Sequence, residues 1–252
     1  MKKLLYFLVV CMALNANNAF SQSSAPTDYS TMIKFATLDG SKANAYYVPS
    51  DSATANVLII FHDITGLDGN MRKEAQKWQA MLGNVDVYAI DMYDGKMTSD
   101  MNMAAKYRDE MNAKHADNIT LGLLAKIGPD KRIVTLGWGK GGEWAFRAAM
   151  LAGSNAIGCI MYYAMPEKEE KNITGLKADV LYNFAAKDIK VHPFYVEDFG
   201  KRVEKNGRKF EMHSLNADAG FAYPDAPRHD ERANAEADRY SLLFMKAKFQ
   251  VQ

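Results

Sequence analysis

Apolar, β-branched runs of strand length recur along this chain, and amphipathic stretches of helical length lie between them. The five central apolar runs cover residues 55–62, 85–92, 132–138, 156–164 and 178–186. The helical stretches cover residues 70–83, 98–127, 141–152, 194–206 and 230–249. Strands that alternate with helices predict a mostly parallel sheet covered by helices on both faces. The functional site of such a sheet lies at the carboxyl ends of its strands.

Further strand-like segments extend this predicted sheet to seven or eight strands. Residues 32–38 and 43–48 are expected to open it as a hairpin around a turn at residues 39–40, and residues 209–215 are expected to close it. The fold class is therefore α/β. A chain of 252 residues suits one domain of this class, which we place at residues 31–252.

The first residues have the pattern of an export signal. Two lysines are followed by the apolar run Leu4–Leu14, which is too short to span a bilayer as a helix. The small residues Ala19 and Ser21 predict cleavage before Gln22. We therefore expect a signal peptide over residues 1–21, no stable membrane anchor, and a periplasmic or secreted mature protein. Residues 22–30 are rich in Ser and Ala and are expected to form a flexible segment.

Charge and cysteine content narrow the function further. The formal net charge of +1 provides no basic field for nucleic acid. Of the two cysteines, only Cys159 remains after the predicted cleavage, so the mature monomer forms no internal disulfide. Cys159 lies inside an apolar run, which is typical of a buried structural thiol. The residues His62, Asp63, Asp188 and His192 match no metal-ligand spacing, so neither a metal nor another cofactor is expected.

One strand ends in a glycine-rich turn that leads directly into a helix. The strand Arg132–Trp138 is followed by Gly139-Lys140-Gly141-Gly142 and then by a helical stretch. A strand, a sharp glycine-flanked turn and a helix form a nucleophile elbow, which lifts one side chain above the sheet at the positive end of the helix.

The turn and several other segments resemble the dienelactone hydrolase family. Residues 137–142 are similar to the family pattern G-[FY]-C-x-G-G, and the likeness extends over roughly residues 30–249. The other matching segments are residues 62–67 with 71–72, 91–96, 162–164, 186–193 and 217–221, and the closing helix with Tyr240 and Phe244. The resemblance implies an α/β-hydrolase fold, hydrolysis of ester or lactone bonds by a Cys–His–Asp triad, and no metal.

The chain departs from the family at two of the three triad positions. Gly139 stands at the nucleophile position and Ala219 at the position of the histidine base, so only the acid, Asp188, is retained. Glycine has no group that can attack a carbonyl, and alanine accepts no proton. Residues 138–145 contain no Ser, Thr or Cys that a shifted alignment could use instead.

Three polar residues near the elbow have two interpretations each. Asp188 is either a surviving catalytic acid or a turn cap held by backbone amides. Asp63 stands where the family has a glutamate, and it either binds ligand or caps the following loop. Lys140 is either a solvated lysine at a helix start or part of an ion-pair cluster with Asp63 and Asp188 that fills the former pocket.

The backbone around the elbow is expected to keep the family's geometry. Gly139 should lie at the apex in a strained conformation that glycine adopts at least cost. The backbone amides of Ile64 and Lys140 should remain as oxyanion donors and leave an anion-friendly hole without an attacking group, and the cavity above Gly139 is either open or filled by side chains. The aromatic residues Trp138, Tyr163 and Phe221 are expected to belong partly to the core and partly to the pocket wall.

Two classes of function follow, and we favour the first. In the first, the chain is a non-catalytic family member, and it binds a small carboxylate, ester or lactone ligand or an unidentified protein partner. Alternatively, it is an active hydrolase of carboxylic esters or lactones, in which Asp188 or His192 activates water.

Overall fold

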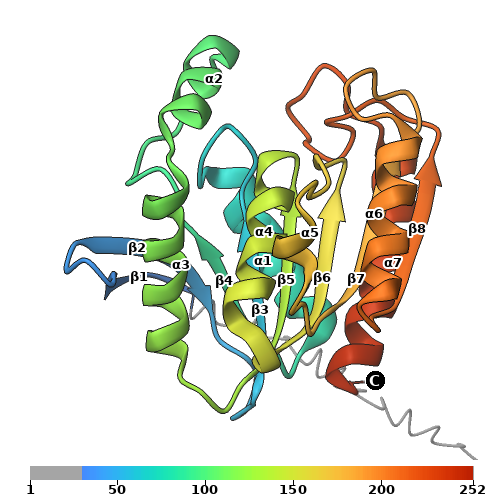
Figure 1. Cartoon of the computed structure of the whole chain (residues 1–252). Helices are drawn as coiled ribbons and strands as arrows, with labels where there is room; N and C mark the ends of the chain where they lie inside the picture. Colours follow the sequence, from blue (N-terminus) through green and yellow to red (C-terminus); the bar gives the residue numbers. More distant parts are fainter. Residues whose placement is uncertain (1–29, 252) are drawn as a thin grey trace, which may run out of the picture.

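The computed structural model describes residues 30–251, which form one eight-stranded sheet with helices on both faces (Figure 1). The strands are β1 (Thr31–Ala36), β2 (Lys42–Val48), β3 (Asn56–Phe61), β4 (Asp86–Ile90), β5 (Arg132–Trp138), β6 (Ala156–Tyr162), β7 (Asp179–Ala185) and β8 (Phe210–Leu215). The helices are α1 (Gly69–Leu82), α2 (Met101–Glu110), α3 (Ala113–Ile127), α4 (Lys140–Ala152), the 3-10 turn η1 (Gly153–Asn155), α5 (Glu170–Ile173), α6 (Pro193–Lys205) and α7 (Glu231–Phe249).

The sheet has the mostly parallel topology that the sequence predicts. Its strand order is β1-β2-β4-β3-β5-β6-β7-β8, and only the β1–β2 and β2–β4 pairs are antiparallel. The predicted α/β fold is therefore confirmed. The proposed signal peptide and nearly all of the flexible segment lie outside the described residues. None of the helices within residues 30–251 is long and apolar enough to cross a membrane.

The helical stretch expected over residues 98–127 is divided into two helices, α2 and α3. Helix α2 ends at Glu110, and the following residue, Met111, has an extended backbone with φ −72° and ψ 117°. Asn112 then caps α3, since its side-chain oxygen accepts a hydrogen bond from the His115 amide at 2.8 Å. An asparagine favours such a cap over a helix interior, because its side chain replaces the missing backbone acceptor. The short helix α5 was not anticipated from the sequence.

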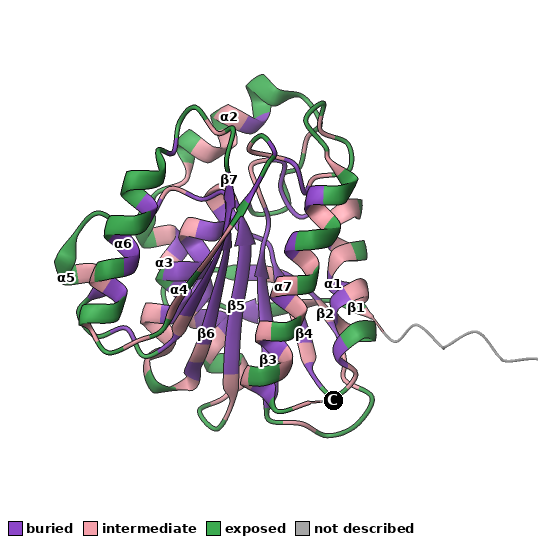
Figure 2. Ribbon diagram, turned by 90° about the vertical axis from the view of Figure 1, so that its right-hand side faces the viewer, coloured by how far each residue is buried: buried purple, intermediate pink, exposed green. Residues whose placement is uncertain are grey.

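Burial on both faces explains why the strands are continuously apolar. All six residues of β3 are buried, and the central strands are buried along almost their whole length (Figure 2). One core cluster packs the sheet against α3, α4 and α6, and the other packs it against α1 and α7. Parallel sheets with helices on both faces have this pattern of burial.

Glycines bring α4 unusually close to the end of β3. A Cβ atom at Gly141 would lie 2.3 Å from the carbonyl oxygens of Phe61 and His62. A Cβ atom at Gly137 would lie 2.1 Å from the Gly141 oxygen. Only glycine permits these approaches, so the turn is fixed directly against the loop that follows β3.

Candidate active site

The turn between β5 and α4 places Gly139 at its apex. Gly139 has φ 51° and ψ −117°, a combination that other residues rarely adopt. Its amide donates a hydrogen bond to the Tyr162 oxygen at 2.9 Å, and its carbonyl accepts one from Gly142 at 3.1 Å. The backbone thus forms the sharp strand–turn–helix connection of an elbow, at the carboxyl ends of the strands.

The carboxylate of Asp63 fills the space that a side chain at Gly139 would need. A Cβ atom built on Gly139 would lie 2.6 Å from Asp63 Oδ1 and 2.9 Å from Oδ2. Atoms do not approach this closely without displacement, so Gly139 and this position of Asp63 depend on each other. The position of the missing nucleophile is occupied by a carboxylate from another loop.

The two backbone amides expected to form an oxyanion hole hold this carboxylate. The Ile64 amide donates to Asp63 Oδ1 at 2.8 Å, and the Lys140 amide provides a second hydrogen bond. The anion-friendly hole is therefore filled by a side chain of the protein itself. Amides at a helix start attract the nearest anion, and the chain supplies one of its own.

Burial dominates the ionisation of this carboxyl group. It raises the pKa of Asp63 from 3.8 to about 6, while the hydrogen bonds from the Ile64 and Lys140 amides act in the opposite direction. The charge of Glu143 raises this pKa further, and that of Arg108 on α2 lowers it. Helix α2, which carries Arg108, lies beyond the carboxyl ends of the strands (Figure 1).

Two buried tyrosines complete the surroundings of Asp63. Burial raises the pKa of Tyr93 and that of Tyr163, and the charge of Asp63 adds to both increases. The Tyr93 hydroxyl has no hydrogen-bond partner among residues 30–251. The Tyr93 ring packs against His62 at 4.7 Å and Trp144 at 5.6 Å between ring centres. Tyr93 was not named as a site residue from the sequence, although it lies in the family-like stretch 91–96.

Of the two interpretations of Lys140, the ion-pair cluster with Asp63 and Asp188 is wrong. Lys140 Nζ lies 2.5 Å from Glu143 Oε2, three residues along α4. Within the described residues, the lysine forms no ion pair with Asp63 or Asp188. A partner three residues away on the same helix is reached without bending the side chain back over the turn.

The retained acid position has the geometry of a turn cap. Asp188 Oδ1 accepts a hydrogen bond from the Lys190 amide at 2.8 Å, and the Asp188 amide donates to the Ala185 oxygen at 3.0 Å. Ala219 is partly buried and packs beside the core cluster that contains Phe221. No imidazole stands between Asp188 and the elbow in the part of the chain described here.

All five histidines have other partners. His62 Nε2 accepts from the Met92 amide at 3.0 Å, so Nδ1 carries the proton and donates to the Asp63 carbonyl at 2.6 Å. Burial lowers the pKa of His62, which fixes it as a neutral structural residue. The remaining four contact Asp94 (His115), the Phe194 amide (His192), Glu211 (His213) and the Phe221 carbonyl (His229). None is placed as a base for the elbow.

The three aromatic residues expected near the site are all buried. The ring of Trp138 lies 5.5 Å from that of Tyr162, and Tyr163 meets Phe221 edge-on at 5.1 Å. Tyr163 also has a positive φ of 38°, which is uncommon for a bulky residue. These side chains belong to one buried core cluster. No group of three or more His, Cys, Asp or Glu residues within residues 30–251 is arranged to hold a metal ion.

Comparison with known proteins agrees with this architecture. The model of the dienelactone hydrolase family matches residues 43–249. A dienelactone hydrolase-like promiscuous phosphotriesterase from metagenomic libraries is similar in structure, with 15% identity, a TM-score of 0.74, and 87% of this chain and 99% of that chain covered. No curated protein matches the chain.

Two further solved structures share the fold. The dienelactone hydrolase from Anabaena variabilis is 16% identical, with a TM-score of 0.63, and 86% of this chain and 97% of that chain are covered. Brefeldin A esterase, a bacterial homologue of human hormone-sensitive lipase, is 12% identical, with a TM-score of 0.66 and coverage of 90% and 80%. At these identities the structural likeness shows the fold alone, whereas the family match covers most of the sequence. The chain therefore belongs to the dienelactone hydrolase family.

Proposed function

We propose that this protein is a non-catalytic member of the dienelactone hydrolase family that binds a small carboxylate, ester or lactone ligand. One observation carries the proposal: the Asp63 carboxylate lies 2.6 Å from where the Cβ atom of a nucleophile at Gly139 would be. The position is thus both empty of a nucleophile and closed by an anion. Anionic Asp63 also disfavours the oxyanion that ester hydrolysis would form at the same amides.

The loss of the triad predicts a very low rate of hydrolysis. In serine hydrolases, removal of the nucleophile or the base reduces turnover roughly a million-fold, and the remaining activity comes from the oxyanion hole and substrate binding. Here the Ile64 and Lys140 amides already hold Asp63. This source of residual activity is therefore also reduced.

Hydrolysis of activated short-chain esters and lactones by the purified protein tests the proposal. We expect no turnover above the rate in buffer between pH 5 and 9. Turnover comparable to that of ordinary family hydrolases would refute it, because Gly139 and Ala219 would then not be the empty catalytic positions.

A second candidate function is hydrolysis by residues outside the family triad. The Asp63 carboxyl favours it, because a buried acid with a pKa of about 6 at the elbow can act as a base near neutral pH. Asp188 and His192 are weaker candidates, since each caps a turn or helix. Turnover that is lost in Asp63→Asn and kept in Asp188→Ala would assign the chemistry to Asp63, whereas loss in Asp188→Ala would assign it to the retained acid.

We also propose that the protein is exported. The two N-terminal lysines, the apolar run Leu4–Leu14 and the small residues Ala19 and Ser21 support this proposal. N-terminal sequencing of natively expressed protein should give a terminus near Gln22. Recovery of an intact Met1 terminus would contradict export by cleavage.

A further inference from the structure

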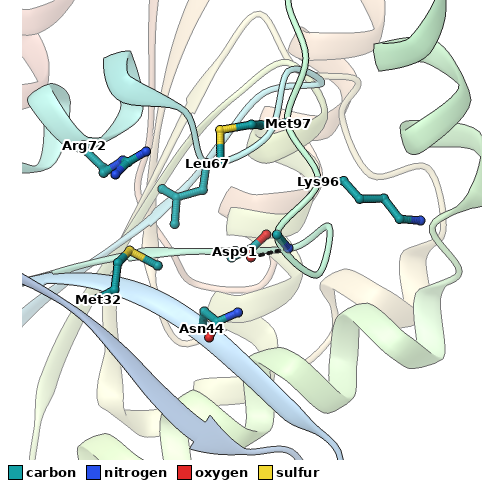
Figure 3. A pocket seen from close by; sticks show the side chains of 8 residues that line it. Met32, Asn44, Leu67, Arg72, Asp91, Lys96 and Met97 are labelled. Carbon is teal, nitrogen blue, oxygen red and sulfur yellow. Dashed lines mark hydrogen bonds between the residues drawn. The ribbon is translucent and has the colours of Figure 1, made fainter.

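A cavity of about 190 Å³ lies beside the loop after β3, and Leu67 of that loop forms part of its wall (Figure 3). Its walls come from the β1–β2 hairpin, from the start of α1 with the preceding loop, and from the loop after β4. The lining residues used below are Met32, Asn44, Leu67, Arg72, Asp91 and Met97. None of them belongs to the elbow.

Hydrogen bonds and close packing hold the walls of this cavity in place. The Asp91 carboxylate accepts hydrogen bonds from the Tyr93 amide at 3.0 Å and the Gly95 amide at 2.6 Å. The Thr98 amide donates to the Thr65 oxygen at 3.0 Å, which ties the loop after β4 to the loop after β3. The cavity is therefore pre-formed, which lowers the entropic cost of binding.

Two polar side chains at the cavity keep unused hydrogen-bonding groups. Arg72 Nε contacts the Asp68 carbonyl oxygen at 3.4 Å, but within residues 30–251 its two terminal nitrogens have no acceptor. The Asn44 side-chain amide likewise has no partner in the described part of the chain. A guanidinium group with two free N–H edges matches the planar geometry of a carboxylate.

Besides Arg72, the charged side chains at the cavity are Lys96 and Asp91, and both already have partners. Lys96 extends away from the other side chains (Figure 3), and its Nζ lies 3.8 Å from Glu110 and 5.6 Å from the Tyr107 ring centre. The Asp91 carboxylate is buried and holds two backbone amides. Amide donors thus hold both oxygens of this carboxylate, and Arg72 is the cation at the cavity that can receive an anion.

The remaining wall is apolar and sets the size of the ligand. Leu67 is buried, while the thioether side chains of Met32 and Met97 are each 48% exposed. Methionine adapts to irregular apolar ligands because its side chain is unbranched and polarisable. An apolar cavity of roughly 150 Å³ accepts a benzene-sized molecule, so a volume of about 190 Å³ accommodates one ring or a short branched chain with a carboxylate attached.

We propose that this cavity binds a small monocarboxylate with a compact apolar body, with the carboxylate on Arg72 and the body against Met32, Leu67 and Met97. The inference deepens the proposed function and rests on it for the view that the protein binds a small carboxylate. It places that ligand away from the elbow, whose amides hold Asp63. Residues 63–67 connect the two sites, since Asp63 lies at the elbow and Leu67 at the cavity.

Titration of the full-length protein with benzoate, followed by amide NMR shifts and by calorimetry, tests the proposal. We expect saturable binding with a dissociation constant on the order of 1 mM or below, as suits a ligand of this size. Benzyl alcohol and benzylamine, which keep the ring and lose or reverse the charge, should bind at least about tenfold more weakly.

Three single substitutions test where benzoate binds. Arg72→Met keeps the aliphatic stem and should weaken benzoate binding about tenfold or more, whereas Arg239→Met on the exposed face of α7 should leave it unchanged. Met97→Trp should block the cavity and abolish binding. Unchanged thermal unfolding of each variant shows that the fold is kept.

The proposal is overturned if benzoate does not bind up to about 20 mM, if benzyl alcohol binds as well as benzoate, or if Arg72→Met binds normally. Benzoate binding that depends on Asp63 rather than on Arg72 would place the ligand at the elbow and would also overturn it. These outcomes are separate from ester turnover, which would refute the non-catalytic function without affecting benzoate binding.

Discussion

The mutual dependence of Gly139 and Asp63 can be measured by combining one substitution at each position. Gly139→Ala adds a single Cβ atom, which would lie 2.6 Å from Asp63 Oδ1 at a residue with φ 51°. Asp63→Ala removes the carboxylate and leaves the space above the elbow free. The two single variants and the double variant form a thermodynamic cycle.

The structure sets the size of each effect. Holding alanine at a positive φ costs about 1–2 kcal/mol in either background. In the parent, the new methyl group must also displace the carboxylate from the Ile64 amide, 2.8 Å away. A buried hydrogen bond lost in this way costs about 1–3 kcal/mol. Gly139→Ala should therefore destabilise the parent by about 2–5 kcal/mol and the Asp63→Ala protein by only about 1–2 kcal/mol.

Urea unfolding of the four proteins, followed by circular dichroism, gives the free energies. A coupling energy of at least about 1 kcal/mol is expected. Gly40→Ala provides the control for the backbone effect. Gly40 lies in an exposed turn with φ 82°, and a Cβ atom there would have no other atom within 4 Å. Additive effects of Gly139→Ala and Asp63→Ala would refute the reasoning, because they would show that the carboxylate does not lie at the nucleophile position.

Three further predictions concern other features of the chain. Because burial raises the folded-state pKa of Asp63 from 3.8 to about 6, the native state binds this proton more tightly than the unfolded state. Stability should fall as pH rises from about 4 to about 6, by at most roughly 3 kcal/mol, and Asp63→Asn should remove this decrease in urea titrations. Gly66→Ala should destabilise by about 2–4 kcal/mol in thermal unfolding, since its Cβ would lie 2.5 Å from the Lys96 oxygen; the cost of Gly40→Ala should stay near 1 kcal/mol. Burial raises the pKa of the Cys159 thiol to about 12, so a thiol reagent should modify it only on unfolding. A rapid reaction of the native protein would contradict this.

The sheet and the elbow were predictable because local patterns determine them. Continuous apolar runs mark strands buried on both faces, and the glycines at 137, 141 and 142 mark the close approach of α4 to the sheet. The break between α2 and α3 was also readable in principle. Asn112 is a favourable N-cap residue, and the long helical pattern around it obscured this signal.

The state of the site depends on contacts between distant segments, which the sequence does not specify. Asp63 follows β3 and Gly139 follows β5, and nothing in either segment fixes where the carboxylate points. The Lys140–Glu143 pair is different, since its spacing of three residues on a helix was visible in the sequence. The cavity beside Arg72 requires three segments to meet, so no local pattern indicates it.

The most direct test of the central claim, that the elbow is closed by the protein's own carboxylate, is the titration of Asp63. The carboxyl carbon of Asp63 can be followed by ¹³C NMR, and its signal assigned by its loss in Asp63→Asn. The structure predicts a pKa of about 6, because the group is buried at the elbow. A pKa at or below the ordinary value of 3.8 would contradict the account, because burial at the elbow would then not dominate the ionisation of this group.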